Sequence, residues 1–197
     1  MEKTKVLLMN MPSSIRVYGK SALKGIIAPR PFLSMAELSA SVLAAGGDCK
    51  ILDLQISEHP HEEIAEKIRD FNPDFVGITF TTLLFDEAKK ISSFIKQNFP
   101  EKTIIAGGVH PTIFPEEVIK EKSIDIAVFG EGDITLQEIV KGIPLKKIKG
   151  LAYKDKKGTI IKNPPRSVIE NLDSLPMPAW HLFKPEIYMN PKAIAKE

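Results

Sequence analysis

Residues 103–112, TIIAGGVHPT, join a short apolar run to a turn of small residues. A second stretch of this kind follows, because the apolar run IDIAVFG at 124–130 leads into the turn GEGD at 130–133. The chain contains only 12 glycines among 197 residues, so two glycine clusters placed directly after apolar runs need a physical reason. Glycine lacks a Cβ atom, and backbone at such a turn can therefore approach another segment or a ligand closely.

Apolar runs of the same type occur at regular intervals upstream, at 5–10, 49–54 and 74–80. The five runs are rich in β-branched residues and lack strict alternation, which is typical of strands buried on both faces of a parallel sheet. The segments between them carry apolar residues at helical spacing: Met35, Leu38, Val42 and Ala45; Ile64, Ile68 and Phe71; Ala88, Ile91 and Ile95; Val118 and Ile119; Ile134, Ile139 and Val140. This alternation predicts an α/β fold, a doubly wound, flavodoxin-like five-stranded parallel sheet with helices on both faces.

The character of the chain changes after the fifth predicted helix. Residues 146–162 read as two short strands around a Lys-Asp-Lys-Lys-Gly turn, which predicts a small C-terminal hairpin. Prolines at 164, 165, 176 and 178 then indicate a proline-rich strap lying on the edge of the domain. We therefore divide the chain into a Rossmann-like binding domain, 1–145, and a hairpin with a linker strap, 146–197.

Ligands of doubly wound folds bind at the carboxyl ends of the strands, so the two glycine clusters are expected on one rim. A long connection at about 11–31, between the first strand and the first helix, belongs to the same rim. Connections of this kind usually take two to six residues. The long loop is a candidate ligand cover, and a variable surface excursion is the alternative.

Composition and charge give no support for several classes of partner. The 27 basic and 25 acidic residues leave a net charge of +2, which gives no reason to expect nucleic acid. No stretch is long and apolar enough to cross a bilayer and the start has no signal-peptide layout, so we expect a cytoplasmic protein without a membrane partner. The single Cys49 cannot by itself form an intrachain disulfide or hold an iron–sulfur cluster.

The sequence also lacks the common catalytic and nucleotide-binding motifs. It has no GxGxxG after the first strand, no phosphate loop, no phospho-acceptor arrangement and no GxSxG turn. His59, His61, His110 and His181 do not have metal-ligand spacing. We predict no catalytic residue and no metal ligand, and a rim of bare backbone and hydroxyls that binds rather than reacts. The alternative is that the glycines only close tight turns.

Five stretches of the chain resemble a known family. They are PRPFLSMAELSASVLAAGGDCKILDL, FNPDFVGITFTT, IIAGGVHPTIFPEE, DIAVFGEGDITLQEIV and LDSLPMPAW, and the resemblance covers about residues 3–182. Together they resemble the N-terminal cobalamin-binding domain of class B radical S-adenosylmethionine enzymes. That group includes the anaerobic magnesium-protoporphyrin monomethyl ester cyclases and many cobalamin-dependent radical methylases. The resemblance implies cobalamin as the cofactor, with the corrin over the carboxyl rim and the nucleotide tail in a slot beside the sheet.

Carried over residue by residue, the resemblance implies a set of cofactor-binding residues. The tail would pass between the threonines after the third strand and the glycines after the fourth, and the turn after the fifth would admit its dimethylbenzimidazole end. His110 is expected to be structural rather than a cobalt ligand. The full set is Asn10, Pro12, Asp53, Gln55, Thr79, Thr81, Thr82, Gly107, Gly108, Val109, His110, Thr112, Gly130, Glu131 and Gly132.

The chain departs from related patterns in two ways. In the mutase and methionine-synthase type of cobalamin domain, DxHxxG after the second strand supplies a lower histidine ligand, whereas this chain has Gln55 and Glu58 at those positions. We therefore expect cobalt without a histidine lower ligand. The family's CxxxCxxC is absent, so an iron–sulfur cluster and S-adenosylmethionine would belong to a radical domain outside the 197 residues. We expect a truncated enzyme or a stand-alone module without activity of its own.

The intact enzyme would then use cobalamin for methyl transfer or for oxidative cyclisation, with the radical domain as the partner of this one. Two other interpretations of the function stay open. The first is a flavodoxin-like binding or interaction domain that does not bind cobalamin. The second is a small enzyme that uses the long loop.

Overall fold

A computed structural model describes residues 2–12, 30–155, 157–184 and 188. The predicted ligand cover between the first strand and the first helix falls largely on 13–29, outside the described residues. Within the described ranges, no helix is long and apolar enough to cross a membrane.

The structure contains one sheet of seven strands, in the order β2-β1-β3-β4-β5-β6-β7. The first five strands are parallel to one another and have the flavodoxin-like order that the sequence predicted. The strands are β1 (Lys5–Asn10), β2 (Asp48–Leu52), β3 (Phe75–Thr79), β4 (Thr103–Gly107), β5 (Ile126–Val128), β6 (Leu151–Lys154) and β7 (Ile160–Lys162).

The predicted hairpin is present, but it is not a separate appendage. Its strand β6 pairs antiparallel with β5, with Ala127 opposite Ala152, and β7 pairs with β6. The five-stranded sheet of the sequence prediction is therefore extended to seven strands. Sequence patterns did not indicate this pairing because both faces of β5 are buried whether or not its edge has a partner. The division of the chain at 145/146 stays a prediction.

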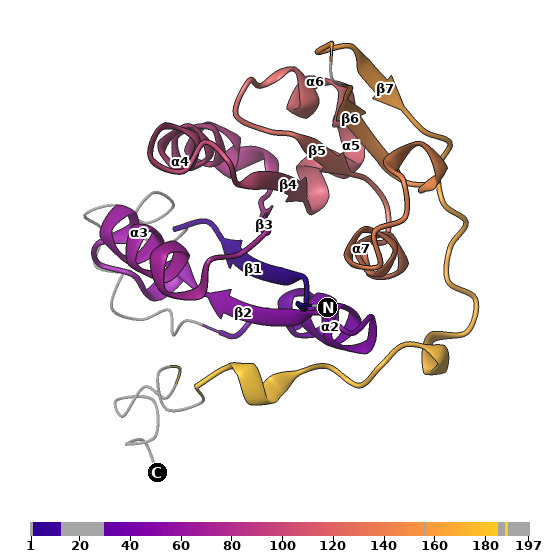
Figure 1. Ribbon diagram of the computed structural model, residues 1–197. Coiled ribbons are helices and arrows are strands. Elements are labelled where there is room, and N and C mark those ends of the chain that lie inside the picture. Colours follow the sequence, from indigo (N-terminus) through magenta and orange to yellow (C-terminus); the bar gives the residue numbers. More distant parts are fainter. Residues whose placement is uncertain (1, 13–29, 156, 185–187, 189–197) are drawn as a thin grey trace.

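Helices cover both faces of the sheet, as Figure 1 shows. One face is covered by α2 (Leu33–Ala44) and α7 (Asp133–Val140), which contact each other. The opposite face carries α3 (Pro60–Phe71), α4 (Phe85–Asn98) and α6 (Pro115–Lys120), and a single helical turn, α5 (Val109–Ile113), follows β4. The doubly wound architecture is thus confirmed.

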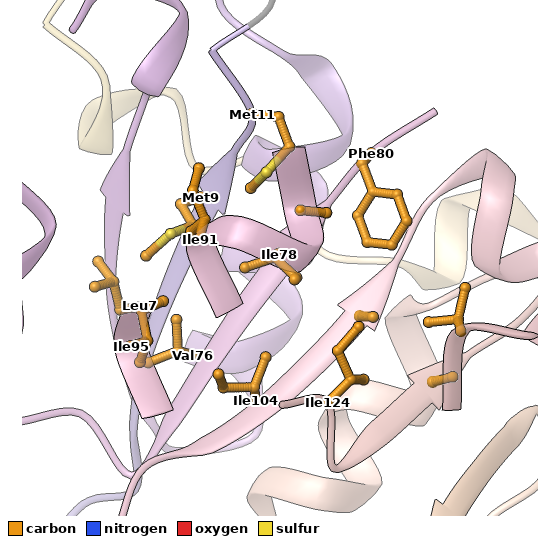
Figure 2. Packing of buried hydrophobic residues seen from close by; sticks show 14 of the residues in the cluster. Leu7, Met9, Met11, Val76, Ile78, Phe80, Ile91, Ile95, Ile104 and Ile124 are labelled. Atoms are coloured by element: carbon orange, nitrogen blue, oxygen red, sulfur yellow. The ribbon is translucent and has the colours of Figure 1, made fainter. Parts of the chain in front are cut away.

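The buried strands explain why the apolar runs do not alternate. Leu7 and Met9 of β1 point to the side of α3 and α4, whereas Val6 and Leu8 pack in the cluster under α2 and α7. Figure 2 shows the first of these clusters, with Phe80 beyond the end of β3. Both side-chain sets are withdrawn from water, so the hydrophobic effect acts on every residue of a central strand. This packing fixes the positions of the strand ends that form the rim.

The residues after β7 form an extended segment along the edge of the domain, as predicted. We call residues 164–184 together with Tyr188 the strap. It contains two short 3-10 turns, η5 (Leu172–Ser174) and η6 (Trp180–Leu182). In Figure 1 the strap leaves the hairpin, passes along the outer side of α2 and reaches the side of the molecule on which the arrow of β2 points.

Candidate cofactor site

The ends of β3 and β4 lie side by side, and their glycines differ in function. Thr79 pairs with Gly107 in the sheet, and the Phe80 N–H donates to the Gly107 carbonyl at 3.3 Å. Gly108 has φ of 100°, and a Cβ atom there would lie 2.7 Å from Thr79 Oγ1 and 2.9 Å from the Phe80 carbonyl oxygen. A Cβ atom on Gly107 would meet no atom within 4 Å. Gly108 is therefore required for packing, while Gly107 borders open space.

Thr112 joins the two glycine clusters. Its hydroxyl donates to the Gly108 carbonyl at 2.8 Å and accepts from the Gly130 N–H at 3.2 Å. Gly130 has φ of 76°, and a Cβ atom there would also meet nothing within 4 Å. The turns after β4 and β5 thus lie next to each other, and each leaves open space at the rim.

Exposed side chains of two kinds surround these turns. Thr81, Thr82 and Thr112 are exposed, and so is Val109. Sequence reasoning missed three apolar neighbours that are also exposed: Leu83 at 81%, Ile113 at 58% and Phe114 at 45%. Their only sequence signal is that they lie beside the motifs but outside the apolar stripes of the helices. We call the ends of β3, β4 and β5, with these side chains, the open end of the rim.

His110 points away from solvent into an aromatic cluster. The residue is 3% exposed, and the centroid of its ring lies 4.4 Å from that of Phe85 and 5.3 Å from that of Phe114. Nδ1 is 3.2 Å from Thr82 Oγ1, and Nε2 has no hydrogen-bond partner among the described residues. Burial lowers the pKa of His110, an effect that the charge of Glu117 partly opposes. The imidazole ring therefore packs inside the protein, next to the rim.

At the ends of β1 and β2, the polar groups are bonded to one another. The buried Asn10 donates from Nδ2 to Asp53 Oδ1 at 2.6 Å, and its Oδ1 accepts from the Leu54 N–H at 2.7 Å. Asp53 Oδ1 also accepts from the Gln55 N–H at 2.9 Å, which caps the turn η2 (Leu54–Ile56). Pro12, just after β1, is buried. We call this part the closed end of the rim.

The second oxygen of Asp53 bonds to the strap. Tyr188 donates its hydroxyl to Asp53 Oδ2 at 2.7 Å, and Gln55 Nε2 donates to the Arg30 carbonyl at 3.2 Å. Burial raises the pKa of Tyr188, and the bonded carboxylate raises it further, so the phenol stays protonated. Sequence reasoning missed Tyr188, and no local signal marks it, because it is distant from Asp53 along the chain.

The turn before α7 serves packing as well as the rim. A Cβ atom on Gly132 would lie 3.1 Å from Leu38 Cδ2, so this glycine lets α7 begin close to α2. The exposed Glu131 accepts from the Ile169 N–H of the strap at 2.8 Å. Next to it, Ser41 donates to Asp133 Oδ1 at 3.2 Å, and burial raises the pKa of that carboxyl.

The predicted site residues thus divide into two groups. Those at the open end surround open space with backbone, hydroxyls and apolar surface, which suits a large ligand. Those at the closed end are occupied by internal hydrogen bonds. In the ranges that the structure describes, no three His, Cys, Asp or Glu side chains are grouped so as to hold a metal ion. The space that a side chain would fill at Gly107 and Gly130 fits a cofactor that enters with its own metal.

The fold and this rim define a ligand-binding α/β domain of flavodoxin-like topology. The model of the B12 binding domain family matches residues 31–140, more than half of the chain. The chain therefore belongs to the B12-binding domain family. Cobalamin, expected from the sequence, is confirmed as its cofactor.

Curated relatives agree with this assignment. The chain is 35% identical over 194 residues to a protein of Pyrococcus horikoshii named as an uncharacterized methyltransferase, covering 95% of this chain and 40% of that protein. It is 31% identical to an anaerobic magnesium-protoporphyrin IX monomethyl ester cyclase of Rubrivivax gelatinosus, over 53% of this chain and 19% of the cyclase. The chain thus corresponds to less than half of the length of these relatives.

A solved structure shares the fold. It is that of the cobalamin-dependent S-adenosylmethionine radical enzyme OxsB with aqua-cobalamin and S-adenosylmethionine bound. The match has a TM-score of 0.73 at 22% identity and covers 90% of this chain and 24% of OxsB. At this level of identity the match supports the overall architecture alone.

Proposed function

We propose that this chain holds cobalamin at its carboxyl rim as part of a cobalamin-dependent radical S-adenosylmethionine enzyme. The observation that carries the proposal is the open space at Gly107 and Gly130, on two turns that Thr112 holds together. When bound, cobalamin supplies a cobalt that can carry a methyl group or take part in electron transfer. The residues of this chain bind and orient it, without acid–base chemistry of their own.

The open end would supply most of the contact. Backbone at Gly107 and Gly130 allows close approach of a bulky group, and the exposed Thr81 and Thr82 offer hydroxyls to its amide side chains. Val109 and Phe114, which are 57% and 45% exposed, would regain apolar contacts against the corrin edge. Apolar surface together with a few convergent polar groups is the usual composition of a cofactor site.

We further propose that no histidine of this chain ligates the cobalt. Gln55 follows β2 at the position where another class of cobalamin domain has its histidine, and its amide donates to the Arg30 carbonyl. His110, the histidine on the rim motif, has its ring buried among aromatic side chains.

The names of the relatives indicate only the class of reaction that the whole enzyme would perform. A Streptomyces wedmorensis protein, 25% identical over 75% of this chain, is named as a cytidylyl-2-hydroxyethylphosphonate methyltransferase, and the Pyrococcus protein is also named as a methyltransferase. Because the relative aligned along 95% of this chain has a methyltransferase name, we favour methyl transfer over oxidative cyclisation. A radical S-adenosylmethionine domain would be the partner of this one.

The test of cofactor binding is direct. The purified chain is mixed with hydroxocobalamin and desalted, and its visible spectrum is recorded. We expect a corrin band that co-elutes with the protein in a ratio of about one to one. A band that stays with the small-molecule fraction, from a chain shown by circular dichroism to be folded, contradicts the proposal.

The lower ligand is tested on the reduced Co(II) complex by electron paramagnetic resonance. A coordinated nitrogen splits each cobalt line, and replacing ¹⁴N by ¹⁵N in the protein changes that splitting only if the nitrogen belongs to the protein. We expect identical spectra from unlabelled and ¹⁵N-labelled chain. A changed splitting pattern would identify a protein nitrogen as the ligand. It would contradict the proposal that no histidine of this chain ligates the cobalt.

A further inference from the structure

The strap is bound to the rim at two points. Near its start, the Ile169 N–H donates to Glu131 Oε2 at 2.8 Å, and at its far end Tyr188 donates to Asp53 Oδ2 at 2.7 Å. Glu131 and Asp53 follow β5 and β2, which are the outer parallel strands of the rim. Two carboxylates that the sequence suggested for the cofactor thus hold the strap.

Contacts of other strap residues keep the strap on the α2 and α7 side. Arg166 pairs with Glu138 of α7, and the Ala179 N–H donates to the Ala36 carbonyl of α2 at 2.9 Å. The ring of Phe183 is buried, and its centroid lies 6.0 Å from that of Tyr188. Tyr188 therefore lies beside Asp53, just beyond the end of β2.

Asp53 connects the strap to the closed end of the rim. One carboxylate oxygen accepts from Asn10 and from the Gln55 N–H, while the other accepts from Tyr188. Asp53 is 8% exposed, and its carboxylate, which accepts from three donors, has little freedom to rotate. The same carboxylate thus contacts both the rim turn at Gln55 and the strap.

We propose that the Asp53–Tyr188 hydrogen bond is a latch through which the strap positions the closed end of the rim and responds to a ligand bound at the open end. This inference rests on the proposed binding of cobalamin at the rim. Tyr188 is a positioning residue, because it acts through Asp53.

The latch can be followed by nuclear magnetic resonance of chain labelled with ¹³C at tyrosine Cζ. The chain has three tyrosines, and Tyr188→Phe removes and thereby assigns one signal. We expect hydroxocobalamin, which is diamagnetic, to shift the Tyr188 signal. Tyr153, buried on β6 at 8% exposure, is the internal control, and its signal should not move.

Release of the cofactor gives a second measurement. Removal of one hydrogen bond to a carboxylate should let Tyr188→Phe lose bound hydroxocobalamin roughly threefold to tenfold faster than the unchanged chain. Tyr153→Phe removes the same hydroxyl from β6, which lies near the opposite edge of the sheet from β2, and should release hydroxocobalamin at the unchanged rate. Circular dichroism of both variants shows whether each is folded.

The outcomes separate the two proposals. If cobalamin is retained while the Tyr188 signal stays in place and Tyr188→Phe releases it at the unchanged rate, the latch is refuted and the cofactor proposal stands. If the folded chain retains no cobalamin, the proposed function fails and the latch fails with it. A shift of the Tyr188 signal together with faster release from Tyr188→Phe, but not from Tyr153→Phe, supports both.

Discussion

At one end of the rim, Asn10 and Asp53 are buried and every polar contact described for them lies within the protein. At the other end, Thr81, Thr82 and Val109 are exposed around glycines that border open space. Both ends consist of loops that follow parallel strands, and sequence reasoning assigned both to the cofactor. The comparison shows that position on a rim does not determine what a residue does there. The closed end preserves the shape of the rim, and the open end is available to a ligand.

The largest expected effect is at the closed end. Asn10→Ala removes a donor from Asp53 and leaves the Leu54 N–H without its side-chain acceptor, both in a buried setting. We expect the free energy of unfolding to fall by about 2–4 kcal/mol. Urea denaturation measures it. The control at the open end is Thr81→Ala, an exposed threonine whose loss should cost less than about 0.5 kcal/mol. Equal losses at the two positions would remove the distinction between the ends.

The neighbouring glycines Gly107 and Gly108 offer a sharper test within the open end. Gly108→Ala places a Cβ atom 2.7 Å from Thr79 Oγ1 in a residue with φ of 100°, and should destabilise the fold by about 1–3 kcal/mol. Gly107→Ala adds the same atom to open space and should change stability by less than about 1 kcal/mol. Thermal unfolding of the two variants compares them. A larger loss of stability in Gly107→Ala than in Gly108→Ala would contradict the conclusion that Gly108 is required for packing.

The same open space predicts an effect on binding rather than on folding. Gly107→Phe fills it with a ring and should weaken retention of hydroxocobalamin by at least about tenfold, which is about 1.4 kcal/mol. Gly107→Ala is the matched control and should retain most of the affinity. Equilibrium titration followed by visible absorbance gives both dissociation constants. Unchanged affinity in a folded Gly107→Phe variant would place the cofactor elsewhere.

The smallest effect concerns His110. Its pKa is lowered from 6.5 in the folded chain, so the unfolded chain takes up the proton at a higher pH than the folded one. This contribution to stability is complete above the unfolded pKa of 6.5 and is lost as the pH falls towards the folded value. His110→Phe, which keeps an aromatic ring beside Phe85, should therefore show a smaller decrease in the urea midpoint between about pH 7.5 and 5.5. A steeper decrease in this variant would reverse the sign of the assigned shift.

The fold could be predicted in large part because each of its elements has a local signature. The run KVLLMN at 5–10 coincides with β1, and the helical spacings at 64–71 and 88–95 fall within α3 and α4. The addition of β6 to the edge of β5 could not be predicted in this way. Edge pairing requires only backbone groups, and it leaves no pattern in the side chains of β5.

For the site, the sequence by itself determined where a ligand could approach the backbone closely, because a glycine that follows an apolar run can be recognised without a structure. It also determined the family, which the match over residues 31–140 confirms. Only the tertiary structure distinguished Gly107 from Gly108, turned His110 inward, and used Asp53 and Glu131 to hold the strap. These outcomes depend on contacts between residues far apart in the chain. The most distant of them, between Asp53 and Tyr188, joins residues 135 positions apart.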